Sequence, residues 1–303
     1  MLDLYKSCRL CPRDCGVNRL KGEIGFCGES AQLRIGAAVI HKGEEPPLVG
    51  SGGSGTIFIS GCNLGCSFCQ NYQVSQHGLG KIISAEEFAG VCAALRDKGA
   101  ENINIVTGSH AALGIIDGIK AAREAGIKLP ALWNSSGYDS ADTLDLLNKY
   151  IDIYLPDLKT LDSGISGKFF NAADYPETAK AAITKMINTK KTVIIRHLIL
   201  PGYLESTRDV LRWFADNAKD RALLSLMTQY TPVTRHEKKL PMPDGFVSEK
   251  DYETVMSWLE EFNIDDGFCQ ELVTGNDWLP DFERANPFPS ELSLPVFNLK
   301  SDL

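Results

Sequence analysis

The stretch that decides the fold is Thr56-Ile-Phe-Ile-Ser60 followed directly by Gly61-Cys-Asn-Leu-Gly-Cys-Ser-Phe-Cys-Gln-Asn71. The first part is a short β-branched run that predicts a strand, and the second is a polar, cysteine-rich loop at its carboxyl end. Comparable runs recur at 102–106, 131–134, 152–155, 193–200 and 223–228. Together they give six candidate strands.

Helical patterns separate these strands. Helix starts are predicted after Ser84, with Glu87 completing a capping box, and after Ser140, Pro176 and Ser206. Gly99 and Gly126 are expected helix ends, and 248–262 predicts one more helix. Apolar strands alternating with helices predict a parallel sheet with both faces covered.

Unusual polar residues follow all six predicted strands. A barrel rim collects side chains from every strand end, whereas an open sheet concentrates its site at one switch point. We therefore predict a (β/α)6 partial TIM barrel over 56–247. The expected flanks are an N-terminal Cys-rich metal-binding segment and loop (1–55), and a C-terminal helix and tail packed on the barrel (248–303). The tail from 263 is predicted to be irregular and to close the barrel's open side.

The composition narrows the class of protein. The 303 residues are 44% hydrophobic and carry a net charge of −8, so no overall field favours nucleic acid or an anionic membrane. The chain opens without a signal-peptide pattern and has no apolar stretch of membrane-spanning length, so we expect a cytoplasmic protein. Nine cysteines in a reducing compartment indicate metal or redox chemistry. Cys92 and Cys269 stand alone and are interpreted as packing residues.

Cys62, Cys66 and Cys69 form a C-x3-C-x2-C run. Three thiolates on one tight loop suit a four-iron cluster, and the iron without a protein ligand would be open to a cofactor or substrate. The alternative is a zinc knuckle with His77 as the fourth ligand.

A second group of cysteines lies near the N-terminus, at Cys8, Cys11, Cys15 and Cys27. Four thiolates suffice for a closed tetrahedral metal site. Thiolate chemistry alone does not separate zinc from an auxiliary [4Fe-4S] cluster, and both remain open.

Charged residues near the strand ends are further candidates. Asp157 and Lys159 are two residues apart and would share one face of a continuing strand. Arg196 interrupts an apolar strand and is expected to reach an acidic partner or a ligand carboxylate. His197 is interpreted as a hydrogen-bonded packing residue. Glu44 and Glu45 are interpreted as solvated loop charges.

The run GCNLGCSFCQN, with Phe68 before the third cysteine, resembles the signature of radical S-adenosylmethionine (SAM) enzymes. Cys69-Gln-Asn71, Asp157-Leu-Lys159 and Arg196 before Pro201-Gly202 resemble the pyruvate formate-lyase activase-like branch, whose members activate glycyl-radical proteins. The resemblance implies a [4Fe-4S] cluster, SAM, a 5′-deoxyadenosyl radical, and a one-electron donor such as flavodoxin or ferredoxin. It also implies a glycyl-radical protein as a substrate.

The same resemblance implies where SAM would bind. The positions it indicates are Phe68, Asn71, Thr107, Gly108, Ser109, His110, Asn134, Ser135, Asp157, Lys159 and Arg196. Thr107 to His110 replace the family's Gly-Gly-Glu motif, so either backbone carbonyls of this segment or the side chains of Ser109 or His110 would contact the amino group. Asn134-Ser135 stands where activases present an acidic residue. Gln229-Tyr230 stands where they often place a histidine.

Two other functions compete. A barrel lyase would use Lys159 as a Schiff-base nucleophile, which leaves the three adjacent cysteines unexplained. A non-catalytic iron–sulfur electron carrier or metal sensor would need four ligands on the central cluster and no cofactor pocket.

Overall fold

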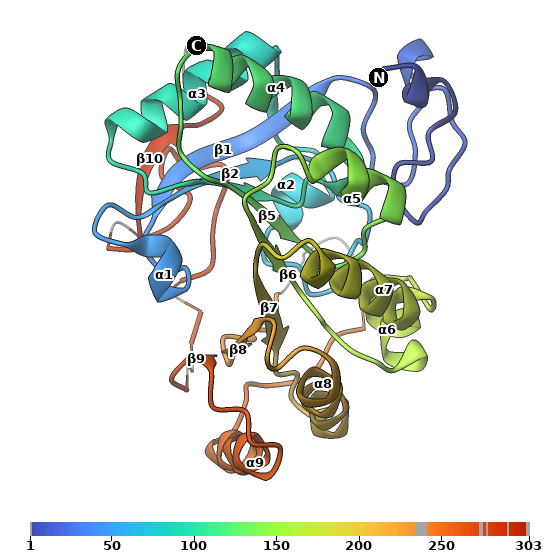
Figure 1. Ribbon diagram of the computed structural model, residues 1–303, viewed down its shortest axis with the longest axis vertical. Coiled ribbons are helices and arrows are strands. Elements are labelled where there is room, and N and C mark those ends of the chain that lie inside the picture. The colour runs from blue at the N-terminus through green and yellow to red at the C-terminus, as the bar shows by residue number, and fades with distance from the viewer. Residues whose placement is uncertain (1, 234–240, 273–274, 277, 290, 301–303) are drawn as a thin grey trace.

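A computed structural model describes residues 2–233, 241–272, 275–276, 278–289 and 291–300 (Figure 1). These residues form one ten-stranded sheet in the order β10-β1-β2-β4-β5-β6-β7-β8-β9, with β3 paired to β1. The strands are β1 (Leu33–His41), β2 (Ser54–Ile59), β3 (Lys81–Ile83), β4 (Ile103–Val106), β5 (Ala131–Ser135), β6 (Ile153–Pro156), β7 (Thr192–Leu198), β8 (Leu223–Met227), β9 (Gly267–Cys269) and β10 (Ser293–Phe297).

The helices are α1 (Pro46–Val49), α2 (Tyr72–Ser75), α3 (Ala85–Asp97), α4 (Ala112–Glu124), α5 (Ala141–Leu147), α6 (Ser163–Phe170), α7 (Tyr175–Asn188), α8 (Leu204–Asn217) and α9 (Glu249–Glu261). Short 3-10 turns occur at Leu2–Ser7, Arg19–Lys21 and Ser109–Ala111. None of the helices in the described ranges has the length and apolar character that crossing a bilayer requires.

The six predicted strands are confirmed as β2, β4, β5, β6, β7 and β8. Each pairs in parallel with the next, so all their carboxyl ends meet at one rim. The connecting helices α3, α4, α5, α7 and α8 follow one another along the outer face of the sheet (Figure 1). This is the predicted (β/α)6 partial barrel.

Most of the predicted helix boundaries are confirmed. Ser84 and Glu87 form the capping box of α3, and Ser140 and Ser248 cap α5 and α9. The start of α8 is corrected, because the helix begins at Leu204 and therefore includes Ser206. The Ser206 hydroxyl lies 2.6 Å from Thr160 Oγ1 and so contacts the neighbouring loop instead of capping the helix.

Strand β1 was not predicted, since residues 1–55 were interpreted as a polar segment and loop. Leu33–His41 is buried along most of its length and pairs antiparallel with β2, which extends the sheet beyond the barrel strands. Gly36 lets α2 pack closely on β1, because a Cβ at that position would lie 2.5 Å from Cγ1 of Val74 in α2.

The C-terminal tail also differs from expectation. It is not wholly irregular, because β9 pairs in parallel with β8 and β10 pairs antiparallel with β1. Between these strands, Phe282 and Phe288 pack on Phe58 of β2, with ring centroids 5.1 and 5.5 Å away. The tail therefore covers the inner face of β2, as expected for a segment that closes the open side.

Helix α1 packs on the barrel strands through Leu48. This side chain is buried with Leu132, Leu155 and Ile194 from three successive strands. This apolar layer forms the floor beneath the polar residues of the rim and fixes the loop that precedes α1 inside the barrel.

Candidate functional site

The three-cysteine loop starts where β2 ends. Gly61 and Gly65 have φ values of +80° and +76°, a backbone region that favours glycine, and they turn the chain tightly around Cys62 and Cys66. The Gln76 side chain donates to the Cys66 carbonyl at 2.8 Å. The loop is thus held by its own turns and by the segment that follows it.

The three thiols face a shared region and are partly exposed. The Cys62 sulfur accepts the Leu64 N–H at 3.3 Å, and the Cys69 sulfur lies 3.3 Å from Ser75 Oγ. Each thiol lies within electrostatic range of the other two. A set of three neighbouring soft donors fits three irons of a four-iron cluster.

A single metal ion requires ligands that meet at one point. Within the described ranges, no three Cys, His, Asp or Glu side chains are close enough together to hold one metal ion. The zinc-knuckle alternative with His77 therefore gains no support, and the His77 ring packs edge-on against Tyr72 instead. A cluster distributes its thiolates over separate irons, so it does not require them to meet at one point.

Phe68 lies in the core. It is 9% exposed, and its ring packs edge-on against Phe169, Phe170 and Tyr230 with centroids 5.3 to 6.0 Å away. The structure therefore gives this aromatic an anchoring role, in which it fixes the loop between Cys66 and Cys69 to the barrel.

A buried network of charges lies at the ends of β6 and β7. Lys159 Nζ is 2.6 Å from Asp157 Oδ2, and Arg196 Nε is 3.2 Å from Asp157 Oδ1. Arg196 also donates to Glu44 Oε2 at 3.2 Å and to Asn134 Oδ1 at 3.1 Å. The expected acidic partner of Arg196 is present. Asp157 and Lys159, which were expected to share one strand face, form an ion pair with each other.

The network favours the charged forms of Asp157 and Lys159, whereas burial raises the pKa of Glu44 in spite of Arg196. Burial alone would raise the pKa of Asp157, but the charges of Lys159 and Arg196 outweigh it and the pKa is lowered. Burial likewise opposes the charge on Lys159, yet Asp157 holds the pKa of Lys159 above its usual value. An amine kept protonated in this way is a poor Schiff-base nucleophile, which counts against the lyase hypothesis.

The interpretation of Glu44 and Glu45 as solvated charges is wrong. Glu45 is 7% exposed, and the Glu44 side chain is 10% exposed where it meets Arg196. Both precede α1, and the packing of Leu48 in the barrel floor draws their loop inward. The only sequence signal was indirect, since an arginine within an apolar strand requires acidic partners.

A cavity of about 700 Å³ adjoins the cysteine loop and the charge network. Of the predicted SAM-binding residues, Asn71, Asn134 and Arg196 line it. Its wall also includes His41, Glu44, Glu45, Phe58, Ser225, Gln229, Gln270, Trp278 and Phe288. Sequence reasoning assigned no site role to most of these residues, which come from β1, β2, β8, the loop before α1 and the tail.

Three lining residues carry buried polar atoms with no hydrogen-bond partner in the described structure. They are Asn71 Oδ1, Glu45 Oε2 and Trp278 Nε1. Buried polar atoms are nearly always paired in folded proteins. These three atoms are therefore available to form hydrogen bonds with a polar ligand or with solvent in the cavity.

Three predicted SAM-binding residues, Ser109 and His110 after β4 and Ser135 at the end of β5, make hydrogen bonds within the protein. Ser109 is buried and donates to Asp139 Oδ1 at 2.6 Å, while His110 Nε2 lies 2.7 Å from the Ser60 carbonyl. Ser135 donates to Asp139 Oδ2 at 2.6 Å. These three side chains hold neighbouring loops together and do not line the cavity.

Asp139 is the residue that the sequence reading missed here. It is 2% exposed, and it accepts hydrogen bonds from the hydroxyls of Ser109 and Ser135 and from the Trp133 indole. Burial raises its pKa in spite of these three donors. No spacing signal linked Asp139 to Ser109, because the contact joins two different strand-end loops.

Thr107 and Gly108 are the other two predicted SAM-binding residues after β4, and they directly follow the carboxyl end of this strand. Thr107 has a φ of +63°, which is costly for a β-branched residue. Its N–H donates to the Asn134 carbonyl at 2.9 Å, and this bond holds the strained residue beside a cavity-lining side chain.

The packing predictions for the two isolated cysteines, Cys92 and Cys269, have opposite outcomes. Cys92 is 1% exposed and packs in the core as predicted. Cys269 is exposed, so its interpretation as a packing residue is wrong. It lies on β9, the last strand of the sheet, where its sulfur contacts Met256 Sδ at 3.4 Å.

His197 is confirmed as a packing residue. Its ring nitrogens lie 2.7 Å from the Leu158 carbonyl and 3.0 Å from Thr207 Oγ1. Burial lowers its pKa to about 4.

The buried imidazole predicts a pH dependence of stability. Between the unfolded pKa, near 6.5, and the folded pKa, only the unfolded chain binds the proton, so acidification favours unfolding. We expect His197 to contribute a loss of about 2 kcal/mol in unfolding free energy between pH 7 and pH 5. Urea unfolding of wild type and His197→Gln at both pH values measures it. The variant should show a smaller pH difference, and an equal difference would contradict the assignment.

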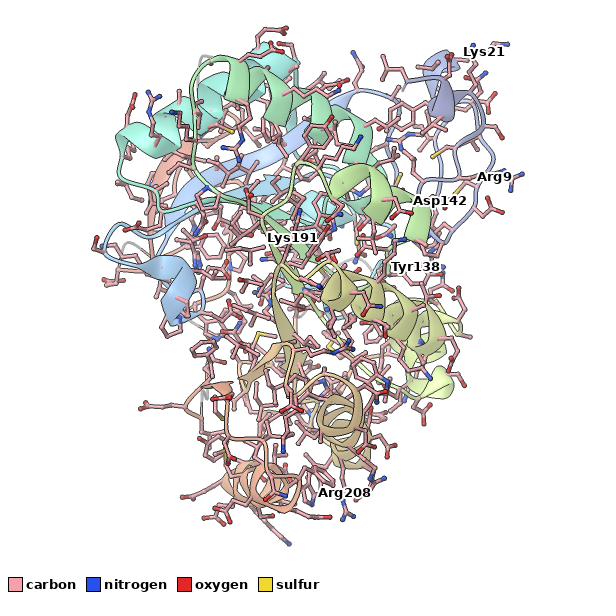
Figure 2. All side chains as sticks on the ribbon, viewed as in Figure 1. Arg9, Lys21, Tyr138, Asp142, Lys191 and Arg208 are labelled. Carbon is pink, nitrogen blue, oxygen red and sulfur yellow. The ribbon has the colours of Figure 1, made fainter. Side chains whose placement is uncertain are left out.

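The N-terminal cysteines lie in a segment beside α5, at the edge of the molecule (Figure 1). Cys8 is buried, Cys11 and Cys27 are partly exposed, and Cys15 is exposed. Arg9 and Lys21 project outward from this segment, whereas Tyr138 lies on the barrel side (Figure 2). The second predicted metal site is thus a separate group of thiols outside the barrel.

Comparisons with known proteins place the chain in a family. The radical SAM superfamily profile matches residues 56–214, more than half of the chain, and the protein belongs to this superfamily. Membership supports radical chemistry by SAM cleavage at a [4Fe-4S] cluster, which requires an electron donor. This chemistry replaces the lyase and the electron-carrier alternatives.

The individual proteins compared below are each less than 30% identical to this chain. An uncharacterized protein of Methanocaldococcus jannaschii is 28% identical over 87% of this chain and 77% of its own length. The pyruvate formate-lyase-activating enzyme of Clostridium pasteurianum is 27% identical over 66% of this chain and 85% of its own.

A solved radical SAM methyltransferase from Sphaerobacter thermophilus aligns with a TM-score of 0.53 at 16% identity, over 72% of this chain. This chain spans 66% of the length of that protein, and 47% of another solved chain that it matches. The likeness shows the fold of the barrel. It does not single out a branch of the superfamily.

Proposed function

We propose that this protein is a radical SAM enzyme of the glycyl-radical activase type, with Cys62, Cys66 and Cys69 as the ligands of its [4Fe-4S] cluster. One observation carries the proposal. A loop with three neighbouring thiols opens beside a cavity whose wall combines both signs of charge with buried, unpaired polar atoms.

The donor set fits the cluster. Three thiolates leave one iron without a protein ligand, and the cavity residues Gln70 and Asn71 follow Cys69 directly. When bound, the cluster supplies the electron that cleaves SAM to methionine and a 5′-deoxyadenosyl radical.

The charge network suits the aminoacyl end of SAM. That group carries an ammonium, a carboxylate and a neighbouring sulfonium, so it needs both signs of charge. Arg196, with Asn134 beside it, offers donors to a carboxylate, while Glu44 and Glu45 offer acceptors to cations. Asp157 keeps Arg196 and Lys159 in place. The backbone of Thr107 and Gly108 is the remaining candidate for the amino group.

The substrate is the finer part of the proposal. The similarity to an enzyme named as a pyruvate formate-lyase activator supports a glycyl-radical protein. A small molecule is the second candidate, because Trp278 and Phe288 of the tail line the cavity and narrow the open side of the barrel. A protein substrate would have to present a short loop there.

The test is anaerobic. The protein with a reconstituted cluster is mixed with dithionite and SAM, and 5′-deoxyadenosine is measured by liquid chromatography. We expect its formation. A protein with a full complement of iron and sulfide that forms none would refute the proposed chemistry.

The substrate is tested separately, by adding a purified pyruvate formate-lyase and recording the electron paramagnetic resonance (EPR) spectrum. A glycyl-radical signal on the added protein supports the activase type. Formation of 5′-deoxyadenosine without that signal would contradict activation of this protein and favour the second candidate.

A further inference from the structure

Residues 8–28, here called the thiol segment, carry four cysteines that the radical chemistry does not use. The segment folds on itself, because the Cys8 N–H donates to the Val17 carbonyl and the Gly16 N–H donates to the Cys8 carbonyl, both at 2.9 Å. This hairpin brings the two ends of the C-x2-C-x3-C run together. Cys11 lies within electrostatic range of Cys8, Cys15 and Cys27.

Two of the sulfurs already accept hydrogen bonds. The Phe26 N–H points at Cys15 Sγ at 3.4 Å, and the buried Arg19 guanidinium lies 3.7 Å from Cys8 Sγ. Hydrogen bonds from such donors are typical of the outer shell that orients the ligands of a metal site. Gly25 leaves room for Cys15, because a Cβ there would lie 3.2 Å from its sulfur.

Apolar packing holds only part of the segment. Leu10 is 5% exposed and packs with Leu113 of α4, whereas Leu20, Ile24 and Phe26 are 44%, 61% and 43% exposed. A segment too small to fold by burial commonly depends on a metal or on disulfides. All four cysteines are free thiols.

Arg13, which lies between Cys11 and Cys15, connects the segment to the cysteine loop of the barrel. Its guanidinium donates to the Asn63 carbonyl at 2.7 Å and to the Leu64 carbonyl at 3.0 Å, both between Cys62 and Cys66. It also donates to the Phe170 and Asn171 carbonyls at 3.2 and 2.6 Å.

Further packing supports this connection. The Arg13 guanidinium stacks on Phe26 at 3.7 Å from the ring centroid. Cys27 is equally close to the loop, since a Cβ on Gly61 would lie 2.7 Å from the Cys27 carbonyl. Gly61 immediately precedes Cys62.

We propose that Cys8, Cys11, Cys15 and Cys27 bind a thiolate-coordinated metal centre, and that this centre stabilises the cluster loop through Arg13. The bound group is zinc or an iron–sulfur cluster, which share the same donor set. The four sulfurs do not converge on one point in the described structure, so zinc binding requires side-chain rotation. The coupling part rests on the proposed role of Cys62, Cys66 and Cys69.

Metal content tests the site. A variant with Cys62, Cys66 and Cys69 all replaced by alanine keeps only the second site, and we expect about one zinc, or roughly four irons with sulfide, per chain. Additional Cys15→Ser and Cys27→Ser substitutions should remove that metal, whereas adding Cys92→Ala should not. A triple variant that is folded by circular dichroism and holds no metal would overturn the proposal, as would metal that survives the loss of Cys15 and Cys27.

Arg13→Gln tests the coupling in the otherwise unaltered protein. We expect it to keep the second metal while a chelator removes the cluster iron about 10-fold faster or more, the scale of outer-shell effects at metal sites. Arg9→Gln is the matched control, because Arg9 pairs only with the exposed Asp14 among the described contacts.

Combining substitutions separates coupling from general damage. Cys15→Ser with Cys27→Ser should accelerate iron loss as Arg13→Gln does, and all three together should add little more. Wild-type rates of iron loss in Arg13→Gln, or fully additive effects, would refute the coupling. Absence of 5′-deoxyadenosine with the second metal retained would refute only the proposed function.

Discussion

Replacing Cys66 with alanine is expected to abolish SAM cleavage. Outer-shell substitutions at metal sites cost about 10- to 100-fold, so removing a ligand from a set of three should exceed about 100-fold. The measurements are iron and sulfide content, the EPR spectrum of the reduced cluster, and 5′-deoxyadenosine formation with dithionite.

Cys92→Ala is the matched control for this prediction. Its thiol is 1% exposed on α3 and packs in the core, so it belongs neither to the cysteine loop nor to the cavity wall. We expect the control to keep both its iron and its activity. A Cys66→Ala protein that retains a four-iron cluster and wild-type 5′-deoxyadenosine formation would contradict the ligand assignment.

Arg196→Met is expected to lower the unfolding free energy by about 3–5 kcal/mol, the cost of leaving a buried charge without its partner. Arg196 is the contact between Asp157 and Glu44, and their side chains are 14% and 10% exposed. In this variant Asp157 retains its ion pair with Lys159. Glu44 is then the carboxylate left without an ionic partner among the described contacts. Urea unfolding followed by circular dichroism measures the effect.

The control is Arg208→Met. Arg208 pairs with Glu261 at 2.9 Å on the outside of the protein, where an ion pair contributes about 0–1 kcal/mol (Figure 2). Adding Glu44→Gln to Arg196→Met should recover part of the loss, because it removes the unpaired charge. Equal effects of Arg196→Met and Arg208→Met would show that the buried network does not contribute as inferred.

Local patterns predicted the barrel well. The strands, the capping boxes and the glycines that end α3 and α4 depend on residues within a few positions of one another. Strand β1 was not predicted, because its sequence LRIGAAVIH lies beside a cysteine-rich, glycine-rich segment and was interpreted as part of that segment. Its role depends on pairing with β2 and β10, which no local pattern specifies.

The candidate site was predictable only in part. The thiol spacing identified Cys62, Cys66 and Cys69, and two-residue spacing indicated that Asp157 and Lys159 lie near each other. The burial of Glu44, the binding of Ser109 and Ser135 by Asp139, and the tail residues at the cavity involve partners far apart in the chain. The sequence contains no local pattern that indicates contact between residues so far apart.

By itself, the sequence determined the chemical class of this protein and the alternation of its elements, because metal-ligand spacing and hydrophobic periodicity are local properties. Only the tertiary structure decided what surrounds the thiols. It brought a carboxylate from before the barrel to Arg196, aromatic residues from the tail to the cavity, and Arg13 to the cluster loop. Those contacts depend on buried charges and backbone carbonyls finding partners when the sheet curls and its flanks pack, which is a property of the whole fold.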